Sequence, residues 1–175
     1  MSKAVLISIR PKWCELIANG AKTVEVRKTR PKLGTPFKCY IYCTQSGVAL
    51  GALGKHGKVI GEFTCDRIYE LAPLNHAPDD VEQQACLTRE EIVRYLKGVG
   101  YGWHISDLKI YDVPKDLNKF WLPPELYCEK ERCGGCPYDQ VADVNGEYSF
   151  DCEWKRPLTR PPQSWCYVEA MKDGD

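Results

Sequence analysis

Three charged residues of this 175-residue sequence have types and spacing that could do chemistry. Lys22, Glu25 and Arg27 place an amine, a carboxylate and a guanidinium close together in the chain. Burial can turn an amine into a general base, a carboxylate can accept a hydrogen bond from a base amino group, and a guanidinium can bind phosphate. The segment therefore predicts either a binding site for a nucleotide-like ligand or a catalytic site.

A short strand must position these side chains, because apolar and polar residues alternate through the segment. Val24 and Val26 share one face of the strand, while Glu25 and Arg27 share the other, and Lys22 precedes them at a turn. We expect the valines to be buried and the charged groups to line a pocket. The alternative is an ordinary edge strand whose charges are solvated.

With the preceding glycine, the charged residues form the pattern Gly-x-Lys-x-x-Glu-x-Arg, and residues 8–13 ahead of them read Ser-Ile-Arg-Pro-Lys-Trp. In these motifs the sequence resembles the ASCH domain family, and the resemblance covers most of the chain. It implies a PUA-like fold with a pocket that binds RNA or a modified nucleotide. In that pocket Arg10, Lys22 and Arg27 would meet phosphate or acceptor groups, and Glu25 would meet a base edge.

RNA recognition favours unstacked bases that pack on aromatic side chains. Trp103 and His104 are the pair that we expect at the same pocket, with Tyr40 or Trp13 as other stacking candidates. The alternative for each tryptophan is a place in the core.

Hydrolysis is the alternative function, and the sequence leaves the enzyme question open. Some members of the resembled family hydrolyse the amide of acetylcytidine with a Lys, a Thr and a Glu, and others are ribonucleases. The family's lysine matches Lys22, which would be the catalytic residue of an enzyme, but the threonine position holds Glu25. Thr23 is adjacent and out of register. A third alternative is a protein-interaction adaptor.

Charge is unevenly distributed along the chain. The formal net charge is zero, yet the first 60 residues carry eleven Lys and Arg against two acidic residues, and the remainder carries thirteen against twenty-two. Zero net charge argues against a general nucleic-acid coat, whereas a local basic face could still meet phosphate. The basic segment 28–34 is a candidate phosphate-contacting loop. Its alternative is a solvated loop, and the two halves could also neutralise each other.

The sequence predicts a cytoplasmic protein with no membrane partner. No apolar run is long enough to span a bilayer, and Arg10 interrupts the apolar start too early for a signal peptide. Six of the ten cysteines lie within apolar segments of a chain large enough to fold without disulfides, which fits a reducing compartment. The oligomeric state stays open.

The other four cysteines lie in residues 113–156, a stretch rich in Pro, Gly and acidic residues that we interpret as an insertion. They are spaced for a tetrahedral structural zinc site, and the metal would stabilise a segment with few large apolar residues. The predicted ligands are Cys128, Cys133, Cys136 and Cys152. The alternatives are free thiols or a redox pair of the two central cysteines.

Apolar periodicity and turn residues predict one domain over residues 1–175, of the α+β class. We expect a small, mostly antiparallel PUA-like β-barrel with two or more flanking helices and a zinc-knuckle-like insertion. The predicted strands are 5–9, 24–27, 37–44, 59–65, 101–111 and 164–171, and the predicted helices are 11–20 and 88–98.

Overall fold

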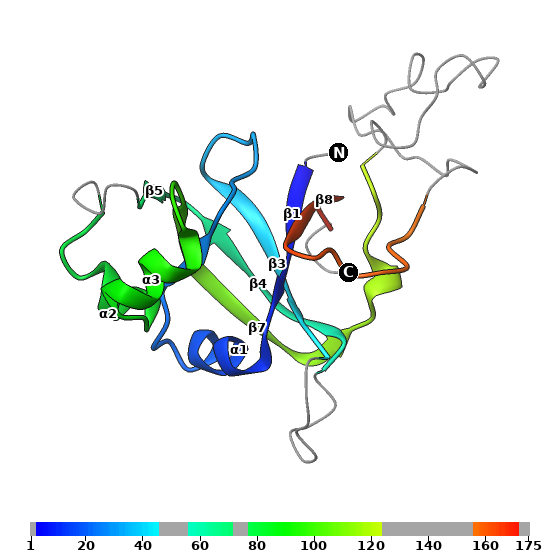
Figure 1. The fold of residues 1–175 in the computed structure, drawn as a ribbon. Coiled ribbons are helices and arrows are strands. Elements are labelled where there is room, and N and C mark those ends of the chain that lie inside the picture. The colour runs from blue at the N-terminus through cyan, green and yellow to red at the C-terminus, as the bar shows by residue number, and fades with distance from the viewer. Residues whose placement is uncertain (1–2, 46–55, 72–76, 124–155, 172–175) are drawn as a thin grey trace.

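The computed structural model describes residues 3–45, 56–71, 77–123 and 156–171 (Figure 1). The strands are β1 (Lys3–Ile9), β2 (Val24–Arg27), β3 (Phe37–Cys43), β4 (Lys58–Cys65), β5 (Ile68–Glu70), β6 (Tyr101–His104), β7 (Ser106–Lys115) and β8 (Trp165–Glu169). The helices are α1 (Pro11–Ala18), α2 (Val81–Ala85) and α3 (Arg89–Leu96), followed by a short 3-10 helix (Leu117–Lys119).

Five strands form the larger sheet in the order β7-β4-β3-β1-β8. β1 runs parallel to β3 and antiparallel to β8, and the other pairs are antiparallel. From Ala4 onward every residue of β1 is buried, which explains why this strand is a continuous apolar run. Its two faces belong to two different cores. Val5, Ile7 and Ile9 face one of them, and Ala4 and Leu6 face the other.

Three strands form a second sheet in the order β2-β6-β5. The chain passes from this sheet to the larger one between His104 and Ser106, and Asp107 takes a left-handed conformation with φ 48°. The sequence predicted a single strand over 101–111 with a weak point at Ser106 and Asp107. The structure instead has two strands, β6 and β7, in different sheets.

The sheet-rich α+β class is confirmed, but the predicted β-barrel is not closed in the part of the chain that the structure describes. In the described residues β7 and β8 are the edges of the larger sheet and β2 and β5 are the edges of the smaller one. Closure would require a hydrogen-bonded ladder between two of these edges. The two sheets are instead joined by side chains, since Trp103 of the small sheet packs against Phe37 and Trp165 of the large one.

The helices cover the outer face of the small sheet and one end of the larger sheet (Figure 1). α2 and α3 bury Val81, Ala85, Ile92 and Leu96 against the valines of β2. A capping box at Thr88 begins α3, as the sequence predicted. The sequence did not predict α2 or β5, because each spans five residues or fewer and has no clear periodicity.

Part of the predicted insertion belongs to the folded body. β7 runs to Lys115, and Trp121 forms an isolated bridge with Pro157 on the far side of the insertion. Residues 124–155, with all four predicted zinc ligands, lie outside the described residues. In the described part, six cysteines are free, four of them buried, and no helix has the length and apolar character needed to cross a bilayer.

Candidate functional site

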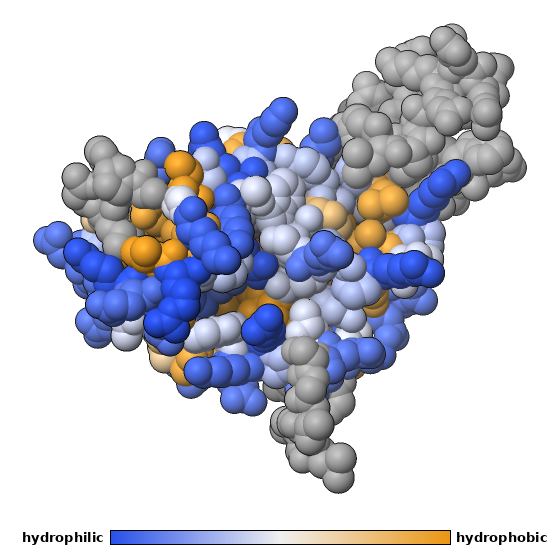
Figure 2. All heavy atoms as spheres, in the orientation of Figure 1, coloured by the Kyte–Doolittle hydropathy of each residue, from blue (hydrophilic) through white to orange (hydrophobic). Residues whose placement is uncertain are grey.

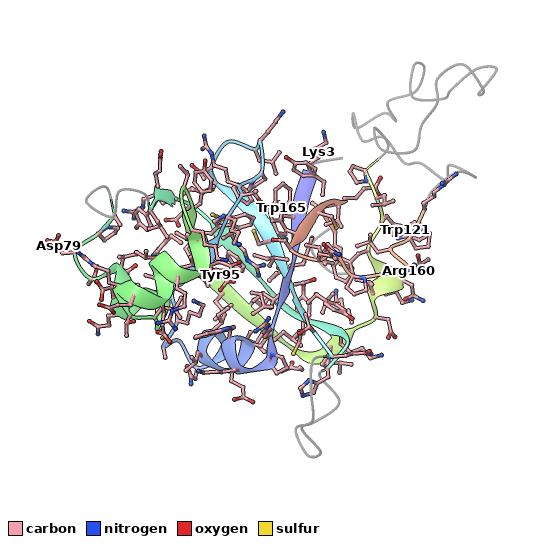
Figure 3. The ribbon with its side chains drawn as sticks, in the orientation of Figure 1. Lys3, Asp79, Tyr95, Trp121, Arg160 and Trp165 are labelled. Carbon is pink, nitrogen blue, oxygen red and sulfur yellow. The ribbon has the colours of Figure 1, made fainter. Side chains whose placement is uncertain are left out.

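An open cleft of about 1190 Å³ lies where the two sheets, two helices and a late segment of the chain meet. β1, α1 and β2 supply one part of its lining, and α3 with the preceding Leu87 supplies another. The rest comes from the end of β3 and the residues beside it (Tyr42, Thr44, Gln45 and Gly57) and from residues 116–118, 158–159 and 161–163. Tyr95 of α3 and Arg160 of the late segment are labelled in Figure 3 on opposite sides of this region. Hydrophilic side chains cover most of the face shown in Figure 2, and apolar residues show between them in small patches.

The turn before β2 is held by backbone hydrogen bonds to three different elements. Gly20, with φ +79°, ends the helical segment in a conformation that favours glycine. The amide of Lys22 then donates to Leu16 O at 2.8 Å, and the amide of Thr23 donates to Gln84 O at 2.9 Å. Ile105 N donates to Thr23 O at 2.8 Å. These backbone hydrogen bonds hold the main chain of Lys22 in place independently of its side-chain contacts.

β2 is an edge strand, yet it is buried on both faces. It pairs only with β6, where Val26 lies opposite Gly102 and Glu25 lies opposite Trp103. A Cβ atom on Gly102 would lie 2.9 Å from Val24 Cγ1, so glycine permits the close packing of the two strands. The alternation predicted from the sequence is present, but the charged face is covered as well as the valine face.

Glu25 stands at the centre of a buried ion network. Its Oε2 lies 3.4 Å from Lys22 Nζ, and its Oε1 lies 3.0 Å from the terminal guanidinium Nη2 of Arg27. The exposed fractions of the three side chains are 2% for Lys22 and 9% for Glu25 and Arg27. The solvated-edge alternative is therefore wrong.

The two cations are also bound by backbone and hydroxyl oxygens. Lys22 Nζ donates to Ala85 O at 2.7 Å. Arg27 Nη2 donates to Ser8 O at 2.6 Å, and Arg27 Nη1 donates to Ser164 Oγ at 3.3 Å. The Nε of Arg27 is buried and has no hydrogen-bond partner among the described residues. The N–H group at Arg27 Nε is therefore the donor of this network whose acceptor does not lie among the described residues.

Burial makes the amine of Lys22 easier to deprotonate. Loss of solvation lowers the pKa of its amine below the ordinary 10.5, and the nearby Glu25 carboxylate opposes this change. The ring of Trp13 lies 5.0 Å from Lys22 Nζ and covers the amine on another side. A lysine in this environment can hold a hydrogen bond to a ligand or give up its proton more readily than a surface lysine.

The structure brings four of the six predicted ligand-binding residues together. Arg10, Lys22, Glu25 and Arg27 all line the cleft, with Arg10 exposed at its rim. Trp103 does not line it, because its side chain is fully buried and packs edge-on against Phe37.

The positions of His104, Tyr40 and Trp13 decide which of them can contact a ligand in the cleft. His104 is absent from the cleft lining, and its Nδ1 lies 2.6 Å from Asp66 Oδ1. Tyr40 is fully buried in the second core, whereas Trp13 lines the cleft. The predicted pair Trp103 and His104 therefore cannot supply the stacking surface in this conformation, and Trp13 can.

Sequence reasoning missed the contribution of α3 to the cleft. No residue of the helix predicted over 88–98 was among the predicted site residues, but Glu91 and Tyr95 line the cleft, and Tyr95 is 44% exposed. The helical position of Tyr95 could have indicated this contribution, since Tyr95 lies off the apolar face formed by Ile92 and Leu96. Ser164 was placed in a strand, and nothing in the sequence indicated that it would bind Arg27.

Neither a zinc site nor another metal centre can be built from the described residues, which contain no group of three or more metal-binding side chains. The predicted ligands Cys128, Cys133, Cys136 and Cys152 lie outside that part of the chain. The zinc site stays a prediction.

The sequence matches no protein-family model, and no curated protein is significantly similar to it. The structure is similar to the crystal structure of ASCH from Zymomonas mobilis, with a TM-score of 0.57 and 18% identity, over 95% of this chain and 87% of that one. A point mutant of that protein gives a TM-score of 0.57 and 18% identity over 95% and 88% of the chains. A second point mutant gives 0.52 and 19% over 78% and 86%.

The chain has an ASCH-like fold. This confirms the resemblance that the motifs of residues 8–13 and 20–27 indicated. In this ASCH-like fold the second motif forms the charged floor of the cleft, and the first motif contributes Arg10 and Trp13 to its rim.

Proposed function

We propose that this protein binds RNA, or a modified nucleotide, in the cleft lined by Lys22, Glu25 and Arg27. The observation that carries the proposal is that three ionisable side chains, each less than one tenth exposed, converge in an open cleft. The ASCH-like fold supports a nucleic-acid-binding or hydrolase domain in general.

The cost of burying these groups favours a functional role. Desolvation of an ion pair usually cancels its Coulombic attraction, and apolar residues of similar volume stabilise a protein at least as well. An edge strand that needed only to be stable would therefore not require Lys22, Glu25 and Arg27. Perturbed ionisable groups within a cleft are typical of binding and catalytic sites.

Each lining residue fits one part of a nucleotide. The unpartnered Nε of Arg27 can donate to a phosphate or carbonyl oxygen, and the exposed guanidinium of Arg10 can bind a phosphate at the rim. Glu25 can accept from a base amino group. Trp13 and Tyr95 provide aromatic rings on which a base can stack.

Arg10→Ala is the first test, because its exposed side chain can be removed without disturbing the buried network. We expect weaker binding of every single-stranded RNA and a salt slope lower by about 0.7, the value for one lost phosphate contact. Fluorescence anisotropy with labelled oligonucleotides at several salt concentrations measures both quantities. Arg67→Ala is the matched control, since Arg67 is also exposed but lies outside the cleft lining.

Two substitutions at the floor of the cleft separate phosphate binding from base recognition. They are Arg27→Ala and Glu25→Gln. The first should weaken all RNAs and lower the salt slope, and the second should change ligand preference more than the salt slope. Unfolding free energies must be measured in parallel. If both variants bind a panel of RNAs as the parent does while unfolding more easily, the network is structural and the proposal is wrong.

Hydrolysis of a modified nucleoside is the second candidate, favoured by the lowered pKa of Lys22. Against it, Thr23 does not line the cleft and uses its backbone to fix the turn, so it does not replace the family's threonine. Turnover of acetylcytidine at about 1 per second or faster, abolished in Lys22→Ala, would establish this activity. Incubation of labelled RNA with the protein tests the ribonuclease alternative in the same way.

We also propose one structural zinc per chain, bound by Cys128, Cys133, Cys136 and Cys152. Elemental analysis of protein purified without added metal tests this directly. Metal-free protein in which all four thiols react freely in the native state would contradict it.

A further inference from the structure

The basic loop after β2 is attached to the edge strand β8 at two points. The side chain of Trp165 donates from Nε1 to Thr29 Oγ1 at 3.0 Å, and the amide of Lys32 donates to Tyr167 Oη at 2.7 Å. Figure 1 draws this loop in light blue between β2 and β3, and Figure 3 labels Lys3 and Trp165 near it. The loop has no regular structure, but its path over β8 is fixed.

Two of the three cations of this loop lie against aromatic rings rather than carboxylates. Lys28 Nζ is 5.4 Å from the ring centre of Tyr95, and Arg30 Cζ is 5.5 Å from that of Tyr101. Lys28, Arg30 and Lys32 are all exposed. None of the three takes part in a salt bridge within the part of the chain that the structure describes.

Four other cations of the protein differ in this respect. Lys38 is paired with Glu62, Lys58 with Asp116, Arg67 with Asp66 and Arg89 with Glu82. Those charges are locally neutralised. The loop therefore carries positive charge that remains available to an external anion, and neighbouring rings give it a surface on which bases can stack.

The loop begins at the edge of the cleft. Lys28 follows Arg27 directly in the chain, and the ring beneath it, Tyr95, lines the cleft. At the same edge Ser164 accepts from Arg27, and the next residue is Trp165 of β8. The cleft and the basic, aromatic surface of the loop are thus continuous.

We propose that Lys28 and Arg30, over the rings of Tyr95 and Tyr101, and Lys32, whose amide donates to the hydroxyl of Tyr167, form a track for the phosphates of a single-stranded polynucleotide. The track rests on the proposed function, because it receives the strand that leaves the cleft. It adds a substrate class to that function. The natural ligand is a strand of several nucleotides, and a free nucleotide fills only the cleft.

The test compares a nucleoside monophosphate with single-stranded RNAs of 4 and 12 nucleotides on the full chain. In the triple variant K28A/R30A/K32A, affinity for the 12-mer should fall at least about tenfold and the salt slope should fall by about 2, three times the single-strand value per contact. Affinity for the monophosphate should stay within about twofold. These side chains are exposed, and the bond from Lys32 to Tyr167 uses the main chain, so we expect the variant to fold.

The matched control is R67A/R89A/K109A, which removes the same charge from exposed positions that do not line the cleft. It should bind the 12-mer as the parent does. An equal loss in this control, or a 12-mer that binds no more tightly than the monophosphate, would overturn the track while leaving the cleft proposal intact. Competition by polyglutamate that is as strong as competition by RNA would also overturn the track, because the loop would then bind any polyanion. Failure of the parent to bind either the monophosphate or RNA would overturn the proposed function and the track with it.

Discussion

Two polar networks of similar composition occur in this protein, and they differ mainly in burial. One joins Lys22, Glu25 and Arg27 in the cleft, with exposed side-chain fractions of 2% to 9%. The other, on the larger sheet, joins Lys38 Nζ to Glu62 at 3.5 Å, with exposed fractions of 30% and 18%. Tyr111 Oη donates to the same glutamate at 2.6 Å.

The difference in burial separates a solvated ion pair on a sheet from an ion network that is shielded from water. In the outer network, solvent still reaches the charges, and burial together with the bond to Glu62 raises the pKa of the Tyr111 phenol, so that it stays a neutral donor. In the cleft network every charge depends on the other two, and Lys22 has a lowered pKa. Burying the charges of the cleft network costs more desolvation free energy than the outer pair requires.

The largest expected contrast comes from removing the central carboxylate of each network. Glu25→Gln leaves two buried cations without a counterion and should lower the unfolding free energy by about 3 to 5 kcal/mol. Glu62→Gln keeps an oxygen that can accept from Tyr111 and should cost about 1 kcal/mol or less. Urea unfolding of both variants measures the contrast. Equal losses would mean that burial does not distinguish the networks.

A smaller effect is expected from the pH dependence of Lys22. Between its lowered pKa and the ordinary 10.5, the unfolded chain holds a proton that the folded chain has released, so the contribution of Lys22 to stability rises with pH in that window. The difference in unfolding free energy between the parent and Lys22→Met should therefore increase by at most about 1.4 kcal/mol per pH unit. Taking the difference removes the opposite contributions of buried thiols and phenols. A difference that is flat from pH 7 to 10.5 would show that Lys22 is not perturbed.

The smallest effect is expected at Lys38. Lys38→Met should change the unfolding free energy by about 0.5 kcal/mol or less, and the change should shrink as salt is added, because an exposed pair is screened. Unfolding at low and high ionic strength tests this. A salt-independent loss of several kcal/mol would place the outer network in the same class as the cleft network.

Local pattern was sufficient to predict most of the fold. The apolar alternation of β3, the proline at the start of α1 and the capping box of α3 each act through neighbouring residues, and the structure contains all three elements. The open sheets were not predictable in this way. Whether two strand edges pair depends on packing between residues far apart in the sequence, such as Trp103 and Phe37.

The residues of the candidate site also divide into those that local sequence indicated and those that only the tertiary structure brings together. Lys22, Glu25 and Arg27 lie on one short segment, so the motif and its resemblance to the ASCH family predicted one site, although their spacing alone could not show that the side chains converge. Ser164 and Tyr95 come from distant parts of the chain and carry no sequence motif. Trp103 was assigned to the site because aromatic residues serve both cores and stacking surfaces, and only its complete burial decides between them.

The three backbone hydrogen bonds at the turn before β2 have a kinetic consequence. Because Lys22 and Thr23 are tied to Leu16, Gln84 and Ile105, this turn cannot open locally without breaking contacts to three elements. Its amide hydrogens should exchange with solvent as slowly as those of the central strand β1, although the turn borders an open cleft. A ligand would meet a backbone that is already ordered, and association should proceed in one step without a slow conformational phase.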